Sequence, residues 1–177
     1  MSKKKKQLTL NDIFFRMPES TDGPAVYELI KNCDPLDINS RYCNLLQTYH
    51  FKDTCVAAEC PNGNLWGFIS GYIIPNSDNT LFIWQVAVSN EARGLGLGKE
   101  MLLHILRRKH LDIHYIHTTI TEENGPSWGM FSSLARDLDT NMSTRLLFDS
   151  EKHFDGRHED EIMLQLGPFS MDIGRRR

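Results

Sequence analysis

Apolar and polar residues follow two different periods along the chain, and these periods predict its helices and strands. Apolar residues recur at helical spacing after Pro24, after Ser40, from Lys99 to Lys109 and after Pro126, which predicts four helices. A period of two, or a run of β-branched and aromatic residues, predicts strands at residues 14–17, 54–59, 65–74, 82–88, 113–121, 144–148 and 161–166. The order β-α-α-β-β-β-α-β-α-β-β predicts an α/β fold in which a mixed sheet carries helices on both faces.

Two of these elements carry patterns that bear on a site. We expect Asn39 or Ser40 to cap the second helix. The apolar residues at helical spacing in that helix are Tyr42, Leu45, Leu46 and Tyr49. In the strand at 82–88, alternation assigns side chains to two opposite faces. One face receives Phe82, Trp84, Val86 and Val88, and the other receives Ile83, Gln85 and Ala87.

Length and composition describe one ordinary domain. The chain has 177 residues, so we predict a single domain over residues 11–167, with a disordered basic lead at 1–10 and a tail at 168–177. The formal net charge of -3 argues against a general nucleic-acid binder. No apolar run approaches the ~18 residues of a membrane span, and the start lacks the apolar stretch of a secretory signal. The 4 cysteines form no C-x-x-C pair, which predicts reduced thiols, no metal site and a cytoplasmic protein.

A glycine-rich turn between a predicted strand and a predicted helix is the most informative segment. Gly94, Gly96 and Gly98 alternate there, flanked by Arg93 and Lys99. Glycines let several backbone N–H groups converge without clashes, and the helix N-terminus adds partial positive charge. The turn therefore predicts a site for a polyanion, most simply a pyrophosphate; the alternative is a turn without a ligand. A Walker loop is excluded because position 100 is not Ser or Thr, and a dinucleotide fingerprint because Lys99 replaces its third glycine.

Arg93, Gly96 and Gly98 spell R-x-x-G-x-G, and this segment resembles the GCN5-related N-acetyltransferase family. Downstream, Asn124 and Ser127 resemble the second coenzyme-binding segment of that family. The resemblance implies a predominantly antiparallel central sheet that splays around acetyl-CoA, the co-substrate, whose pyrophosphate the glycine turn holds. The residues that it implies in acetyl-CoA binding are Val86, Ala87, Val88, Arg93, Gly94, Leu95, Gly96, Leu97, Gly98, Lys99, Asn124, Ser127 and Phe131.

Two positions depart from the common pattern of this family. Phe131 stands where a tyrosine often protonates the leaving thiolate, and phenylalanine donates no proton. Either another residue supplies that proton or none is needed, because a thiolate with a pKa of ~8.5 leaves tolerably by itself. The strand before the turn offers Trp84 and Gln85 in place of the usual carboxylate base. A base must therefore come from elsewhere in the fold or act through water.

Four further segments resemble a narrower group within this family, the enzymes that acetylate the diamino acid L-2,4-diaminobutyrate. They are residues 34–46, 83–88, 119–124 and 158–161. The resemblance implies transfer of acetyl to the 4-amino group, a product that feeds synthesis of the compatible solute ectoine, and a homodimer. It also implies direct attack by the neutral amine, with a backbone N–H near Val86 stabilising the oxyanion. The substrate-binding residues that it implies are Asp37, Tyr42, Trp84, Asn124, His158 and Glu161, and the catalytic candidates among them are His158, Glu161 and Asp37.

Each candidate residue also has a plainer interpretation. Asp37 fits a helix cap, Tyr42 and Trp84 fit core positions, and residues 158–161 fit a solvated charged turn. The acidic pair at 122–123 is an alternative proton relay. For the function as a whole, the alternatives are acetylation of another small amine or a protein amine, and a non-catalytic acyl-CoA sensor.

Overall fold

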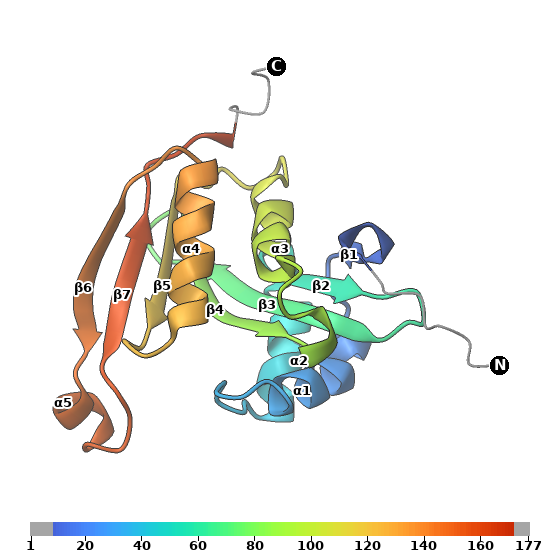
Figure 1. Ribbon diagram of the computed structural model, residues 1–177, viewed down its shortest axis with the longest axis horizontal. Coiled ribbons are helices and arrows are strands. Elements are labelled where there is room, and N and C mark those ends of the chain that lie inside the picture. Colours follow the sequence, from blue (N-terminus) through green and yellow to red (C-terminus); the bar gives the residue numbers. More distant parts are fainter. Residues whose placement is uncertain (1–8, 172–177) are drawn as a thin grey trace.

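A seven-stranded sheet forms the centre of the protein, whose computed structural model describes residues 9–171 (Figure 1). The strands lie in the order β1-β2-β3-β4-β5-β7-β6, and every neighbouring pair is antiparallel except β4 and β5. The predicted mixed and predominantly antiparallel sheet is therefore confirmed. The strands are β1 (Phe14–Arg16), β2 (Val56–Glu59), β3 (Leu65–Ile73), β4 (Thr80–Val88), β5 (Tyr115–Ile120), β6 (Met142–Phe148) and β7 (Glu161–Leu166).

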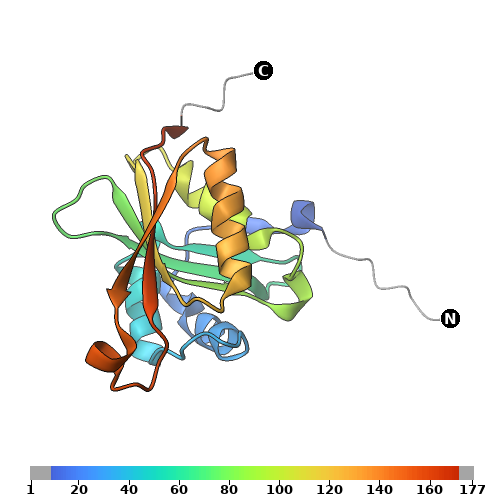
Figure 2. The ribbon, with the colours of Figure 1, turned by 60° about the vertical axis from the view of Figure 1, so that its left-hand side comes forward.

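Helices cover both faces of the sheet, as predicted. α1 and α2 lie on one face of the half formed by β2 to β4, and α3 and α4 lie on the opposite side (Figures 1 and 2). The larger apolar core fills the space between the sheet and α3 and α4, and a smaller core lies beneath α1. The helices are α1 (Gly23–Lys31), α2 (Arg41–Tyr49), α3 (Leu97–Leu106), α4 (Gly125–Asp137) and α5 (Ser150–Phe154). The sequence pattern did not predict α5, a single turn between β6 and β7.

The alternation predicted for β4 is wrong at its centre, because the strand contains a bulge. Ser70 on β3 pairs with Gln85 and Gly71 pairs with Ile83, so Trp84 is an extra residue without a partner of its own. The two faces therefore exchange at this point. Ile83 joins the larger core, the side against which Val86 and Val88 also pack, whereas Ala87 joins the core beneath α1.

β4 and β5 separate beyond the bulge. They pair only from Thr80 to Ile83 and from Tyr115 to Thr118. Past these residues β4 pairs with β3 alone and β5 with β7 alone, and the two halves of the sheet diverge (Figure 1). The sheet thus splays as the family resemblance implies. The edge of β4 from residue 84 to 88 carries no strand partner on this side among the described residues.

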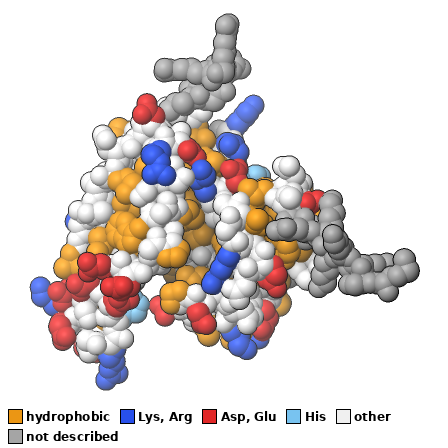
Figure 3. Space-filling view, viewed as in Figure 1, with side chains coloured by type: hydrophobic (Ala, Val, Ile, Leu, Met, Phe, Trp, Pro, Cys, Tyr) orange, Lys and Arg blue, Asp and Glu red, His pale blue; other side chains and the backbone are white. Residues whose placement is uncertain are grey.

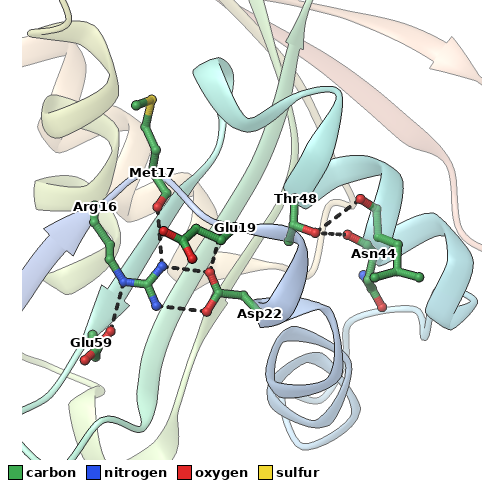
Figure 4. Close-up of polar contacts among 8 residues, drawn as sticks. Arg16, Met17, Glu19, Asp22, Asn44, Thr48 and Glu59 are labelled. Atoms are coloured by element: carbon green, nitrogen blue, oxygen red, sulfur yellow. Dashed lines mark hydrogen bonds and ion pairs between the residues drawn. The ribbon is translucent and has the colours of Figure 1, made fainter.

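α2 buries its polar side chains and exposes its apolar ones. Asn44, Gln47 and Thr48 are buried, and hydrogen bonds hold them together. The Asn44 amide donates to Gln47 Oε1 at 3.0 Å. The Thr48 hydroxyl donates to the Asn44 carbonyl at 3.0 Å (Figure 4). Of the residues that recur at helical spacing, Tyr42 and Tyr49 are 69% and 64% exposed and face away from the core, whereas Leu46 is half-buried.

The packed part of the chain extends past both predicted domain boundaries. Residues 1–8 of the predicted lead lie outside the described residues, but Leu10 begins a 3-10 turn and packs against the larger core. At the other end, Phe169 is buried and its N–H donates to the His114 carbonyl at 3.0 Å. The tail predicted from residue 168 therefore starts too early, because an apolar side chain anchors the segment beyond the last strand. Residues 172–177 are not described.

Candidate active site

A cavity of about 640 Å³ lies where the splayed sheet meets the start of α3 and α4. Its walls come from four parts of the chain: the segment after α1, the second half of β4, the glycine turn, and the first turns of α4. The lining residues are Cys33, Asp34, Pro35, Leu36, Val86, Val88, Ala92, Arg93, Gly94, Gly96, Leu97, Gly98, Lys99, Asn124, Pro126, Ser127, Met130 and Ser133. Ten of these belong to the predicted acetyl-CoA site, namely Val86, Val88, Arg93, Gly94, Gly96, Leu97, Gly98, Lys99, Asn124 and Ser127.

The glycine turn adopts a backbone that other residues rarely adopt. Gly94 has φ +79° and Gly96, which caps α3, has φ +76°. These angles turn the chain so that the N-terminus of α3 faces the cavity, and the first N–H groups of a helix have no partner within it. Gly98 serves a different purpose, since a Cβ at this position would lie 2.6 Å from Met130 Sδ on α4. The turn therefore does two things. It directs the N-terminus of α3 at the cavity, and it lets α3 pack closely against α4.

The two cations of the turn differ in how far the protein compensates their charge. Lys99 Nζ lies 2.7 Å from a carboxylate oxygen of Asp137 and 3.1 Å from the Ser133 hydroxyl, both on α4. Arg93 donates to the Asp34 carbonyl at 3.4 Å, and no carboxylate within residues 9–171 forms an ion pair with it. Arg93 is therefore the cation of the turn that is free to pair with a phosphate.

The start of α4 supplies a second helix N-terminus to the cavity. Asn124 caps this helix, and its side-chain oxygen accepts a hydrogen bond from the Ser127 N–H at 3.2 Å. Both residues line the cavity, as predicted. Within the described chain no hydrogen bond occupies the amide nitrogen of Asn124, so one side chain both starts the helix and offers a donor.

Three predicted coenzyme residues do not line the cavity. Phe131 is buried among the side chains of the larger core, and Ala87 is buried in the core beneath α1. Leu95 packs against the larger core. Met130 and Ser133 take the lining positions on α4 instead, one residue before and two residues after Phe131. Burial on the core face of α4 explains Phe131 without any contact to a ligand.

A second cluster brings together the three predicted catalytic residues. His158 Nε2 lies 3.8 Å from a carboxylate oxygen of Asp37 and 3.8 Å from one of Glu161. These residues come from the segment before α2, the turn before β7 and the first position of β7. The Glu161 side chain is 19% exposed and that of Asp37 is 86% exposed, so the cluster is open on the Asp37 side. Asp37 does not cap α2, because Ser40 accepts the capping hydrogen bond.

The surroundings of His158 fix both the plane and the tautomer of its ring. Nδ1 lies 2.8 Å from the Glu159 carbonyl, an oxygen that only accepts hydrogen bonds. In the neutral ring the proton therefore sits on Nδ1, and Nε2 directs its lone pair toward the two carboxylates. The Phe154 ring covers the imidazole, with 4.6 Å between ring centroids. A ring held in this way presents a proton-accepting nitrogen at a fixed position.

One short segment connects the two clusters. Asp34, Pro35 and Leu36 line the cavity, and the next residue, Asp37, reaches His158. Gln85 at the bulge holds this segment in place. Its amide donates to the Asp37 carbonyl at 2.8 Å, and its oxygen accepts from the Asn39 amide at 2.6 Å. No local pattern predicts these two contacts, because their partners are separated by 46 and 48 positions in the sequence.

The remaining candidates lie outside these two clusters. Trp84 is 45% exposed at the bulge and Tyr42 is exposed on α2, so neither is a core residue. The acidic pair at 122–123 is exposed in the turn before α4, and no contact joins it to His158 within the described chain. Figure 3 shows acidic side chains gathered over α5 and the turn that follows it, with Lys and Arg side chains at the margin. His158 belongs to the segment between α5 and β7. Such a surface favours a cationic substrate.

Cysteine and metal chemistry find little support at this site. Cys33 lines the cavity, which the sequence did not predict, and its thiol donates to the Val88 carbonyl at 3.3 Å. Burial raises the pKa of this thiol, so the protonated form, which is a poor nucleophile, dominates.

Among residues 9–171, no group of three His, Cys, Asp or Glu side chains is arranged to hold a metal ion. No described helix has the length and apolar character needed to cross a membrane.

Comparison with known proteins adds a family and close relatives. The acetyltransferase (GNAT) family model matches residues 23–135. The L-2,4-diaminobutyric acid acetyltransferase of Methylotuvimicrobium alcaliphilum is 48% identical over 158 residues, which cover 89% of this chain and 91% of that protein. The protein of the same name from Vibrio cholerae is 46% identical over 153 residues, with coverage of 86% and 88%.

A solved structure is also similar. Diaminobutyrate acetyltransferase EctA from Paenibacillus lautus, in complex with L-2,4-diaminobutyric acid and coenzyme A, has a TM-score of 0.85 and 38% sequence identity. The similarity covers 92% of this chain and 98% of that chain. Ard1 from Thermoplasma volcanium has a TM-score of 0.70 at 13% identity, which is a likeness of fold.

Proposed function

The chain belongs to the acetyltransferase (GNAT) family, and on this premise we propose how its site works. It transfers the acetyl group of acetyl-CoA to the 4-amino group of L-2,4-diaminobutyrate, giving N4-acetyl-L-2,4-diaminobutyrate. Relatives up to 48% identical carry this activity in their names, and the similar Paenibacillus structure holds both diaminobutyric acid and coenzyme A. We further propose that the product feeds synthesis of a compatible solute.

One observation carries the proposal for the site: a single segment connects the cavity to the His158 cluster. Asp34 to Leu36 line the cavity that the coenzyme would fill, and Asp37 lies 3.8 Å from His158 at the amine side. The splay between β4 and β5 opens between these two clusters. An acetyl group on a coenzyme that enters along the free edge of β4 would therefore face an amine held by the acidic cluster.

The amine must lose a proton before it attacks. An alkyl ammonium has a pKa of ~10.4, so about one molecule in 2500 is neutral at pH 7. Asp37 and Glu161 supply acceptors that bind the ammonium group, and the nearby Nε2 of His158 accepts a proton from it, directly or through water.

Acyl transfer then needs no further acid. The amine nitrogen forms a bond to the acetyl carbon, the carbon–sulfur bond breaks, and the electron pair leaves on the thiolate. The nitrogen then releases its second proton to solvent to give the neutral amide, and the thiolate takes a proton from solvent. A backbone N–H near Val86, on the free edge of β4, stabilises the oxyanion. Phe131 lies in the core, so it takes no part in the step.

The glycine turn and the starts of α3 and α4 bind the coenzyme. Arg93, which pairs with no described carboxylate, and the N–H groups at the start of α3 bind the pyrophosphate. Val86 and Val88 lie beside the pantetheine arm, and Asn124 and Ser127 line the opposite wall. Lys99 contributes mainly to the packing of α3 against α4, because Asp137 compensates its charge.

We also propose that the protein is a cytoplasmic homodimer. The support for reducing surroundings is that Cys33, Cys43, Cys55 and Cys60 are all free thiols. The support for a dimer is the exposed apolar face of α2, whose Tyr42 and Tyr49 have no partner in the core.

Thiol release from acetyl-CoA tests the proposed activity. L-2,4-diaminobutyrate, ornithine, lysine, spermidine and a lysine-containing peptide serve as parallel substrates, and NMR locates the acetyl group in the product. We expect rapid turnover of diaminobutyrate with acetylation at N4. Faster turnover of another amine would show that this amine, and not diaminobutyrate, is the substrate. No turnover of any amine, with acetyl-CoA still raising the melting temperature, would favour the acyl-CoA sensor.

A further inference from the structure

Arg145 is a cation on the open face of the sheet that the chemistry described above leaves unused. It lies on β6 opposite Met163 of β7, and Met163 in turn lies opposite Thr119 of β5. Residues paired across a sheet share a face, so these three side chains form one row. The alternate residues Thr118 and Leu164 face α4, so the row lies on the other face of the sheet.

The guanidinium of Arg145 turns inward across this row. Its Nη2 lies 3.9 Å from Met163 Sδ, so the side chain reaches back over β7 toward β5. Its charge also acts on His117 of β5: burial lowers the pKa of this histidine, and Arg145 lowers it further despite the hydrogen bond to Gln165. No carboxylate of the described part of the chain forms an ion pair with Arg145.

The row lies at the point where the sheet opens. Pairing between β4 and β5 ends at Thr118, and Thr119 is the next residue. Glu161 lies two residues before Met163 on β7 and so on the same face, at a distance of roughly 6.6 Å along the strand. The acidic cluster of Glu161, His158 and Asp37 is therefore on the side of the sheet toward which Arg145 is directed.

This arrangement of charges complements an amino acid. Diaminobutyrate carries ammonium groups and one carboxylate, whereas the His158 cluster supplies acceptors alone. We propose that Arg145 binds the α-carboxylate of the substrate and makes the enzyme select a diamino acid over a simple diamine. The inference rests on the proposed function, and it names a specificity-determining residue for that reaction. A guanidinium pairs with a carboxylate through two parallel hydrogen bonds, which fixes orientation as well as charge.

A substrate without the carboxylate separates this role from a structural one. Propane-1,3-diamine is diaminobutyrate with a hydrogen in place of the carboxylate, so kcat/KM is measured for both amines in the wild type and in Arg145→Gln. We expect Arg145→Gln to lower kcat/KM for diaminobutyrate roughly 10- to 100-fold and to change that for the diamine by less than about twofold. Arg145→Lys keeps the charge and recovers part of the loss. Arg107→Gln, an exposed residue at the end of α3, is the matched control.

Each outcome bears on a different claim. Equal losses with both amines in Arg145→Gln would show a structural role, and no loss with either would show no role; both overturn the inference while leaving the proposed function intact. Absence of turnover of diaminobutyrate by the wild type would overturn the proposed function itself. Circular dichroism and the melting temperature of Arg145→Gln show that the variant compared is folded.

Discussion

His158 gains its proposed role from three contacts, and each contact constrains a different property of the ring. The Glu159 carbonyl fixes the tautomer, Phe154 fixes the ring plane, and the carboxylates of Glu161 and Asp37, each 3.8 Å from Nε2, mark where this nitrogen meets the amine. A side chain held in this way accepts a proton without reorganising. The acidic residues at 122–123 are exposed and have no such support.

Replacement of this histidine tests its role as proton acceptor. We expect His158→Gln to lower kcat roughly 10²- to 10⁴-fold, the usual contribution of general base catalysis, and to leave the Kd of acetyl-CoA within about twofold. Steady-state kinetics and calorimetric titration measure the two quantities. His110→Gln, at an exposed position after α3, is the control. Retention of full kcat by His158→Gln across pH 6 to 9 would remove the residue from this role.

At the scale of elements, the bulge in β4 positions the acidic segment. Gln85 sits at the bulge and holds Asp37 and Asn39 through two hydrogen bonds. We expect Gln85→Met, which keeps the volume and removes both bonds, to raise KM for diaminobutyrate about 5- to 30-fold, since such bonds contribute roughly 1 to 2 kcal/mol. The Kd of acetyl-CoA should change little. An unchanged KM would mean that the segment keeps its place without Gln85.

The glycine turn makes a separate prediction, for the coenzyme. Gly96 has φ +76°, a backbone that costs other residues about 1 to 2 kcal/mol. Gly96→Ala should raise KM for acetyl-CoA about 5- to 30-fold, because the turn must shift to relieve the strain. Gly63 has φ +86° in the hairpin between β2 and β3 and also has open space around it. Gly63→Ala should therefore lower the melting temperature as Gly96→Ala does and leave this KM unchanged; equal effects on KM would contradict the assignment.

The local patterns predicted the elements well and their long-range contacts poorly. The glycine turn, its helix and the cap at Asn124 are readable because each depends on neighbours in the sequence. The bulge at Trp84 cannot be predicted from the sequence of β4 alone, because a residue is recognised as extra only when β4 is paired with β3. The contact of Gln85 with Asn39 cannot be predicted locally either, because the two residues are far apart in the sequence. The family resemblance places Phe131 at the coenzyme, whereas in the structure this side chain is buried in the larger core and the preceding residue, Met130, lines the cavity.

At the scale of the whole molecule, Arg16 joins β1, β2 and the start of α1. Its guanidinium donates to both carboxylate oxygens of Asp22, at 2.7 and 2.8 Å, and to Glu59 at 2.9 Å (Figure 4). Burial alone would raise the pKa of Asp22, but the hydrogen bonds from Arg16 and from the Glu19 N–H lower it overall. The ion pair therefore stabilises the fold above the ordinary pKa of an aspartate and loses its effect as pH falls through the lowered value.

This linkage predicts a pH-dependent effect of Asp22→Asn. At pH 7 the variant should lose about 1 to 3 kcal/mol of unfolding free energy, since charged hydrogen bonds contribute on this scale. The difference from wild type should shrink as pH falls through the lowered pKa of Asp22, because the wild-type carboxyl then takes up a proton. Urea unfolding at pH 7 and at a series of acidic pH values measures it, with the exposed Asp78→Asn as control. A difference that stays constant with pH would show that the charge of Asp22 is not the cause.

The exposed apolar face of α2 is the surface that we expect to form the dimer interface. Tyr42, Leu45 and Tyr49 are 69%, 39% and 64% exposed, and they carry no charge. A stripe of this kind is self-complementary across a two-fold axis, where the same patch of both copies meets. The edge strand β6 is the competing surface, since Leu146 is 50% exposed there.

Two matched variants decide between these surfaces. We expect light scattering after size-exclusion chromatography to give the mass of a dimer for the wild type and of a monomer for Leu45→Glu. Leu146→Glu should remain dimeric, because β6 then lies outside the interface. The reverse result would move the interface to β6, and a monomeric wild type would remove the dimer altogether. Because both leucines are exposed, neither change creates a buried charge, so a change in mass reports on association rather than on folding.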